Sequence, residues 1–137
     1  MKALLKYSVF VVFVFFYSCE NVDFLMNVDC TQCVRVEPIE TRAVLEFSTQ
    51  YGEVPFVIYK GDYESGDIIL QDTITSETYE FDLDVDANYT IAAEYTLSDK
   101  KITVVDGEFI EKRLAASECS LDCWVVLGGD FDLTLKY

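Results

Sequence analysis

Apolar and polar residues alternate along most of this chain, and this period of two constrains its fold more than any other feature. Similar runs span 42–49, 54–60, 67–74, 89–97 and 131–137. The clearest run is 78–85, where Tyr79, Phe81, Leu83 and Val85 alternate with Thr78, Glu80, Asp82 and Asp84. Successive side chains of a strand point to opposite faces, whereas an amphipathic helix needs apolar residues three and four positions apart. The pattern therefore predicts an all-β chain whose strands each bury one face.

Turn signals separate these runs. Asp106-Gly107 predicts a two-residue hairpin between two apolar runs, because glycine accepts the positive φ of such turns. Gly128-Gly129-Asp130 predicts a turn before the last strand, and residues 61–67 predict a longer loop. Short strands with turn signals at this spacing are typical of two antiparallel sheets packed face to face. We therefore predict an antiparallel two-sheet sandwich of eight or nine strands, with a barrel as the alternative.

Residues 81–91, FDLDVDANYTI, resemble the tyrosine corner of fibronectin-type sandwiches. In that motif a Tyr near the start of a strand bonds back to upstream backbone, and Tyr89 has this position. The usual Pro or Gly of the turn is absent, and prealbumin-like sandwiches show similar patterns. The resemblance implies an immunoglobulin-, fibronectin- or prealbumin-like sandwich without separating the three. An ordinary hairpin with an inward Tyr is the alternative.

The first 19 residues have the composition of an export signal. Lys2 and Lys6 precede an apolar stretch over 9–17, and the small Ser18 stands before Cys19. This arrangement resembles a bacterial lipoprotein signal of the looser Bacteroidota type, although it lacks the usual Leu three residues before the cysteine. The resemblance implies cleavage before Cys19 and lipidation of its thiol. It divides the chain into a signal peptide (1–18), a lipid-anchored tether (19–29) and a sandwich domain (30–137). An ordinary secretory signal is the alternative.

The charge balance excludes several classes of partner. Without the two signal lysines, 8 basic residues face 25 acidic ones, a net charge of −17. Nucleic acids and anionic membrane surfaces both demand Lys and Arg, so neither is an expected partner. The chain has no His, and therefore lacks the commonest general base and metal ligand. We expect no enzymatic activity, no cofactor and no metal site. The alternating Asp82, Asp84 and Asp86 fail the EF-hand pattern, since Ala87 and Ala93 occupy its required Gly and Glu positions.

Four cysteines follow Cys19 as two close pairs: Cys30 with Cys33, and Cys119 with Cys123. In an exported protein an even cysteine set predicts disulfides. Crossed bridges between the pairs are favoured, since each would close a loop of about 90 residues and stabilise the fold by about 4 kcal/mol. A structural zinc site and a redox-active CxxC remain as alternatives. Against the redox alternative, residues 34–40 read as a strand, whereas a catalytic CxxC usually begins a helix.

Three further residues are candidates for surface roles. Tyr59 is expected on the face opposite Phe56 and Ile58, and Tyr63 is expected in the 61–67 loop. Aromatic side chains with polar tips are common at binding surfaces, so these two tyrosines form a possible binding surface. Asp72-Thr73-Ile74 resembles the O-glycosylation acceptor of Bacteroidota proteins, which makes Thr73 a possible glycosylation site.

Together these features predict a non-enzymatic, lipid-anchored envelope protein that acts as a binding or structural module. Its expected location is the outer membrane, on either the periplasmic or the cell-surface face. The membrane, reached through the lipid on Cys19, and another envelope protein or a glycan are the expected partners. One alternative is an inhibitor of a basic enzyme such as lysozyme. A zinc or thiol-redox protein is the other.

Overall fold

The computed structural model describes residues 30–31, 34–115 and 122–136, and within them it confirms an all-β sandwich. The described residues form eight strands, the lower of the two numbers predicted. They are β1 (Glu40–Glu46), β2 (Val54–Lys60), β3 (Asp67–Ile74), β4 (Thr78–Asp84), β5 (Ala87–Leu97), β6 (Lys100–Leu114), β7 (Trp124–Leu127) and β8 (Asp130–Asp132). A short 3-10 helix, η1 (Thr49–Tyr51), lies between β1 and β2.

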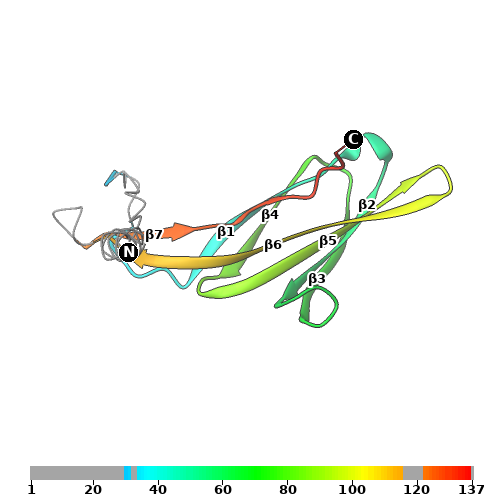
Figure 1. Ribbon diagram of the computed structural model, residues 1–137. Coiled ribbons are helices and arrows are strands. Elements are labelled where there is room, and N and C mark those ends of the chain that lie inside the picture. Colours follow the sequence, from blue (N-terminus) through cyan, green and yellow to red (C-terminus); the bar gives the residue numbers. More distant parts are fainter. Residues whose placement is uncertain (1–29, 32–33, 116–121, 137) are drawn as a thin grey trace, which may run out of the picture.

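The strands form two sheets (Figure 1). One sheet has the order β4-β1-β8, and the other has the order β3-β2-β5-β6-β7. The β1–β8 pair is parallel, with Val44 opposite Asp130, whereas the other neighbouring strands pair antiparallel. The long strand β6 pairs with β5 over one part of its length and with β7 over its far end (Figure 1).

The core lies between the two sheets, and the predicted alternation correctly identified its residues. In β2, Val54, Phe56 and Ile58 are buried, while Pro55 and Lys60 are exposed. The same rule buries every second residue of β5 on the inner side. These residues are Tyr89, Ile91, Ala93 and Tyr95. Inward side chains of β1 and β4 complete the core from the smaller sheet: Ala43, Leu45 and Leu83.

The predicted hairpin at Asp106-Gly107 is wrong. Strand β6 continues through both residues, and the β5–β6 hairpin turns at Ser98 and Asp99, where Ser98 takes a φ of 54°. Gly107 lies opposite Thr90 in mid-strand. A Cβ at position 107 would lie 3.2 Å from the Thr90 Oγ1 atom. Glycine thus suits this position because the neighbouring side chain approaches closely, not because the chain turns.

Two predicted strands are shorter than expected. Within 34–40 only Val34 pairs before β1 begins at Glu40, in an isolated bridge with Trp124. Pro38 lies in this segment and has no backbone N–H to donate to a neighbouring strand. The run at 131–137 pairs only as far as Asp132, whose carboxylate accepts the backbone N–H of Thr134 at 3.0 Å. This local hydrogen bond competes with continued sheet pairing.

Residues 81–91, which resemble a tyrosine corner, connect β4 to β5. Tyr89 is buried at the start of β5. Burial raises the pKa of its phenol, and the charge of Asp84 raises it further. The charge of Lys60 and a hydrogen bond with the backbone of Asp84 partly oppose this rise. Asp86 takes a φ of 57°, a conformation that Asp tolerates better than most residues. Asp86 therefore occupies a conformation that a turn glycine would otherwise adopt.

Candidate functional site

The structure brings the two candidate tyrosines together on the outer face of the five-stranded sheet. Tyr59 lies on the outer side of β2, opposite Thr90 of β5, as predicted. Tyr63 comes from the loop between β2 and β3, also as predicted. Their ring centroids lie 5.8 Å apart at an interplanar angle of 89°, an edge-to-face contact. Pairs of this kind are worth about 1 kcal/mol beyond the area that they bury.

The loop that carries Tyr63 is tied to the sheet by its backbone. Gly61 donates its N–H to the carbonyl of Asn88 at 2.8 Å, and its own carbonyl accepts the Thr90 hydroxyl at 2.8 Å. Gly66 donates to the carbonyl of Asp62 at 2.7 Å, closing the loop. A Cβ at position 66 would lie only 2.7 Å from the carbonyl oxygen of Lys60. The two glycines thus allow a tight loop that holds Tyr63 beside Tyr59.

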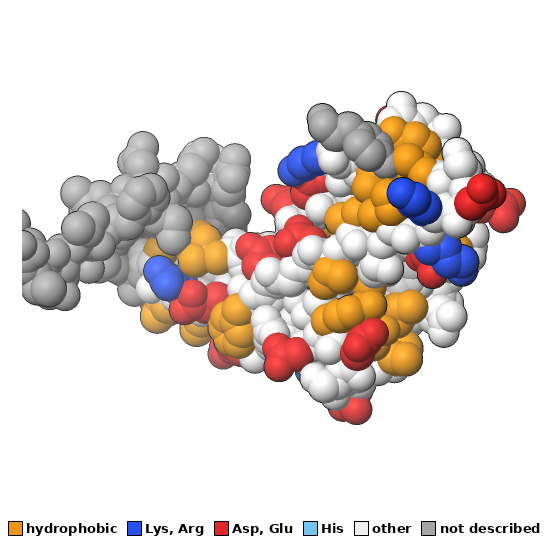
Figure 2. All heavy atoms as spheres, turned by 45° about the vertical axis from the view of Figure 1, so that its right-hand side comes forward, with side chains coloured by type: hydrophobic (Ala, Val, Ile, Leu, Met, Phe, Trp, Pro, Cys, Tyr) orange, Lys and Arg blue, Asp and Glu red, His pale blue; other side chains and the backbone are white. Residues whose placement is uncertain are grey.

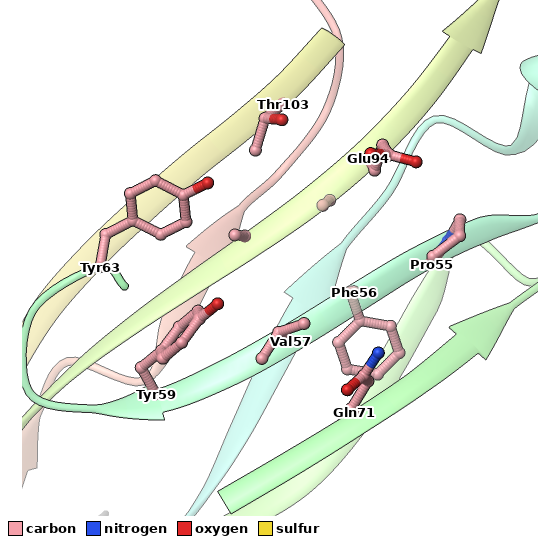
Figure 3. A pocket seen from close by; sticks show the side chains of 10 residues that line it. Pro55, Phe56, Val57, Tyr59, Tyr63, Gln71, Glu94 and Thr103 are labelled. Carbon is pink, nitrogen blue, oxygen red and sulfur yellow. The ribbon is translucent and has the colours of Figure 1, made fainter. Parts of the chain in front are cut away.

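A groove of about 240 Å³ opens beside the two rings (Figure 3). Val57 and the small Ala92 contribute apolar surface to it, from β2 and β5. Three polar side chains from three different strands also line it: Gln71 of β3, Glu94 of β5 and Thr103 of β6. We call this hollow the tyrosine groove; its main lining side chains are Tyr59, Tyr63, Val57, Ala92, Gln71, Glu94 and Thr103. It combines apolar contact with hydrogen-bonding groups, a combination typical of binding sites.

Electrostatics in the groove are set by acidic groups. Glu94 forms an ion pair with Lys101 at 2.7 Å, and both side chains remain accessible to solvent. The pKa of Tyr63 is raised, chiefly by burial and further by the charges of Glu64 and Glu94. Tyr63 therefore keeps its phenolic proton near neutral pH, and a hydrogen bond with the Glu64 side chain also favours this form. The groove presents aromatic rings, hydroxyls, an amide and one carboxylate.

A second hollow lies on the smaller sheet. It has a volume of about 340 Å³ and is lined by Val44, Phe131 and three acidic residues: Glu46, Asp130 and Asp132. The pKa of Asp132 is lowered to about 2, mainly by its hydrogen bond from Lys136 and also by Thr134. This carboxylate is ionised at neutral pH and forms an ion pair with Lys136, while Glu46 and Asp130 add further acidic groups to the hollow. Within the described part of the chain, no cluster of three or more potential ligand side chains could hold a metal ion.

The other predicted site residues are only partly described. Thr73 is exposed on β3 opposite Pro55, and its backbone N–H donates to the Asp72 carboxylate at 2.7 Å. Its hydroxyl is therefore on an accessible strand, although glycosylation stays a prediction. Cys19, Cys33 and Cys119 lie outside the described residues. Cys123 is 2% exposed, and its carbonyl accepts the Ala115 N–H at 2.7 Å.

Sequence reasoning missed the polar residues of the groove. Alternation along 89–97 puts Glu94 on the side opposite Tyr89 and Ile91, but no sequence signal links it to Tyr59 or to Gln71. Only the pairing of β3, β2, β5 and β6 as neighbours places these side chains together. Figure 2 shows one face of the molecule, where exposed apolar side chains form separate patches among charged ones. Such patches cannot be assigned from alternation alone.

Comparisons with known proteins add no relative, since no protein family model, curated protein or solved structure matches this chain. A search of the described residues for a helix long and apolar enough to cross a membrane found none.

Proposed function

We propose that this chain is a non-enzymatic, lipid-anchored envelope protein that binds another envelope component through its tyrosine groove. The observation that carries the proposal is the convergence of Tyr59 and Tyr63 with three polar side chains around one hollow. A loop closed by Gly61 and Gly66 holds the aromatic pair in place, so little side-chain entropy is lost on binding. The partner is a protein or a glycan of the envelope.

The proposed address rests on the signal-like start of the chain. Cleavage before Cys19 and lipidation of its thiol would anchor the domain to the outer membrane, on the periplasmic or the surface face. Two or more acyl chains on one cysteine hold a protein far more firmly than one does. The 19–29 tether would then connect the lipid to the sandwich.

We further propose that disulfides join the two cysteine pairs. The bridge between Val34 and Trp124, with N···O distances of 3.1 and 2.9 Å, brings the segment after the first pair beside the segment after the second. This proximity favours the crossed arrangement, because bridges between the pairs need them to be neighbours.

An intact mass measurement tests the anchor and the bridges together. Protein from the detergent-soluble membrane fraction should begin at Cys19, carry acyl mass, and gain the mass of four hydrogen atoms on reduction, two for each bridge. Treatment with a chelator is the control, because a zinc-bound chain would lose the mass of the metal on chelation, whereas a disulfide-bonded chain would not change. An unacylated chain with four free thiols would contradict both proposals and favour zinc or thiol chemistry.

Site-specific crosslinking tests the binding surface. A photoreactive residue at Gln71, on the rim of the groove, should yield a reproducible adduct in intact cells. Replacing Tyr59 and Tyr63 with alanine should lower that adduct at least about fivefold, since aromatic anchors dominate binding energy at such sites. The matched control is the same photoreactive residue at Glu80, an exposed position on β4 of the other sheet. No adduct at Gln71, or equal adducts with and without the tyrosines, would contradict the proposal.

The acidic hollow on the smaller sheet favours a second candidate, an inhibitor of a basic enzyme. Glu46, Asp130 and Asp132 line it, and the full chain has a net charge of −15. Opposite charge steers association and sets orientation. Protection of bacterial cell walls from lysis by lysozyme is the measurement that separates this candidate from the first.

A further inference from the structure

We propose that the tyrosine groove receives the guanidinium group of an arginine side chain presented by a protein partner. The inference rests on the proposed function and names the chemical group that the groove would bind. It follows from the Tyr59 and Tyr63 rings, the Glu94 carboxylate, the lack of Lys and Arg among the lining residues, and the size of the groove.

The aromatic pair supplies two walls at right angles. The ring planes of Tyr59 and Tyr63 meet at 89°, so the pair presents aromatic surface in two directions. Both hydroxyls point along the groove, away from the β2–β3 loop (Figure 3). The face of an aromatic ring is electron-rich and attracts cations, arginine more often than lysine. This arrangement suits a flat cation better than an anion.

The carboxylate of Glu94 supplies the matching charge. None of the ten lining residues is Lys or Arg. Glu94 lies four residues along β5 from Thr90, the partner of Tyr59, so it lines the other end of the groove (Figure 3). Its nearest described cation, Lys101, lies on β6 with its side chain 70% exposed. An ion pair this exposed is weak and easily exchanged. An incoming guanidinium can therefore replace the Lys101 ammonium and bond to both carboxylate oxygens.

The dimensions favour a single side chain. At about 240 Å³ the groove is smaller than the roughly 300 Å³ typical of the smallest drug-sized pockets. Ala92 opens it, because the neighbouring outward residues Val57 and Glu94 are larger. A guanidinium is planar, stacks on aromatic rings and is weakly hydrated, so it loses less on entering than an ammonium does. The net charge of −15 also favours approach of a basic partner.

The test uses a capped Gly-Arg-Gly tripeptide and its neutral citrulline counterpart as probes. Binding to the isotope-labelled full chain in detergent is followed by NMR. The arginine probe should shift signals of the groove residues, and citrulline should bind about tenfold more weakly, since it keeps the shape without the charge. Glu94→Gln, and Tyr59→Ala with Tyr63→Ala, should each weaken arginine binding by about tenfold.

Lys101→Ala gives the sharpest result. Removing the competing ammonium should tighten arginine binding several-fold, whereas a purely structural role for the Lys101–Glu94 pair would weaken it. Lys100→Ala is the matched control, because it makes the same charge change at the neighbouring exposed position. Glu80→Gln controls for Glu94→Gln, and Phe109→Ala controls for the loss of an exposed ring.

Several outcomes overturn the proposal. Equal binding of arginine and citrulline would remove the role of charge, and equal effects of the Glu80 and Glu94 variants would reduce it to net charge. If a neutral sugar, methyl glucoside, binds at the same residues and the arginine probe does not, the groove is assigned to glycans. If the Gln71 adduct depends on the tyrosines but the arginine probe does not bind, the proposed function stands and this inference falls. If neither occurs, both fall.

Discussion

Replacing Phe56 with alanine is expected to lower the free energy of unfolding by about 4 kcal/mol. Phe56 is 1% exposed, and its ring centroid lies 5.2 Å from that of Phe47 and 5.1 Å from that of Tyr79. Since β2 and β4 belong to different sheets, this ring fills the space between them. Close-packed interiors relax only partly around a deleted ring, so the cavity adds to the lost burial. Such a loss is a large part of the 5–15 kcal/mol available to most domains.

Urea unfolding followed by circular dichroism measures the Phe56→Ala effect. Phe109→Ala is the matched control, because Phe109 is 54% exposed on β6 and its loss should change stability by no more than about 0.5 kcal/mol. Phe56→Leu should lose clearly less than Phe56→Ala, since it keeps much of the apolar volume. A Phe56→Ala variant as stable as Phe109→Ala would contradict the packing described for this ring.

Replacing Tyr95 with phenylalanine is expected to cost about 2 kcal/mol, although it removes a single oxygen atom. The buried hydroxyl of Tyr95 donates to the Leu133 carbonyl at 2.7 Å and accepts the Ser48 backbone N–H at 3.1 Å. Ser48 in turn accepts the backbone N–H of Leu135 through its hydroxyl at 2.9 Å. Without the phenol oxygen, one buried donor and one buried acceptor lose their partner, which costs more than the bonds themselves contribute.

The loss in Tyr95→Phe should also depend on pH. Burial raises the pKa of the Tyr95 phenol, and the hydrogen bond with the Ser48 backbone partly opposes the rise. The stability that follows from this shift is complete below the ordinary value of 10.0 and is lost as pH rises through the higher folded value. The original chain should therefore lose stability more steeply above pH 10 than the phenylalanine variant does.

Denaturant titrations at neutral and alkaline pH, with amide hydrogen exchange at Ser48, make this measurement. Exchange at Ser48 should accelerate in Tyr95→Phe, because its N–H loses its acceptor. Tyr59→Phe is the control, since that ring lies on the outer face, where water can satisfy hydrogen bonds. Equal effects of the two substitutions would show that the hydrogen bonds of the Tyr95 hydroxyl contribute no extra stability.

Much of the fold could be predicted because alternation reports directly which side of a strand is buried. It correctly placed Phe56 and Tyr89 inside and Tyr59 outside, and glycine spacing correctly placed Tyr63 in a loop. These features depend on residues close in sequence. By contrast, the positive φ at Asp86, within 81–91, has no clear sequence signal.

The features that could not be predicted depend on pairing between distant strands. Gly107 reads as a turn residue, yet the nearby Thr90 side chain explains it better. Glu94 reads as a solvated charge, yet its place beside Val57 and Thr103 makes it part of a groove. Neither the role of Gly107 nor that of Glu94 can be recognised until β2, β5 and β6 are known to be neighbours. The sheet order, and the site that it creates, therefore need the structure.

The parallel pairing of β8 with β1 also decides when the domain can finish folding. Val44 meets Asp130 in this pair, and Phe131 and Leu133 enter the core beside it. During synthesis β1 and β4 emerge early, but the residues that cover β1 on its other side emerge long afterwards. Contacts between such distant residues slow folding, and apolar surface stays uncovered in the meantime. A nascent chain that has not passed residue 133 therefore lacks part of its core, so the domain cannot finish folding before residues 130–133 are made.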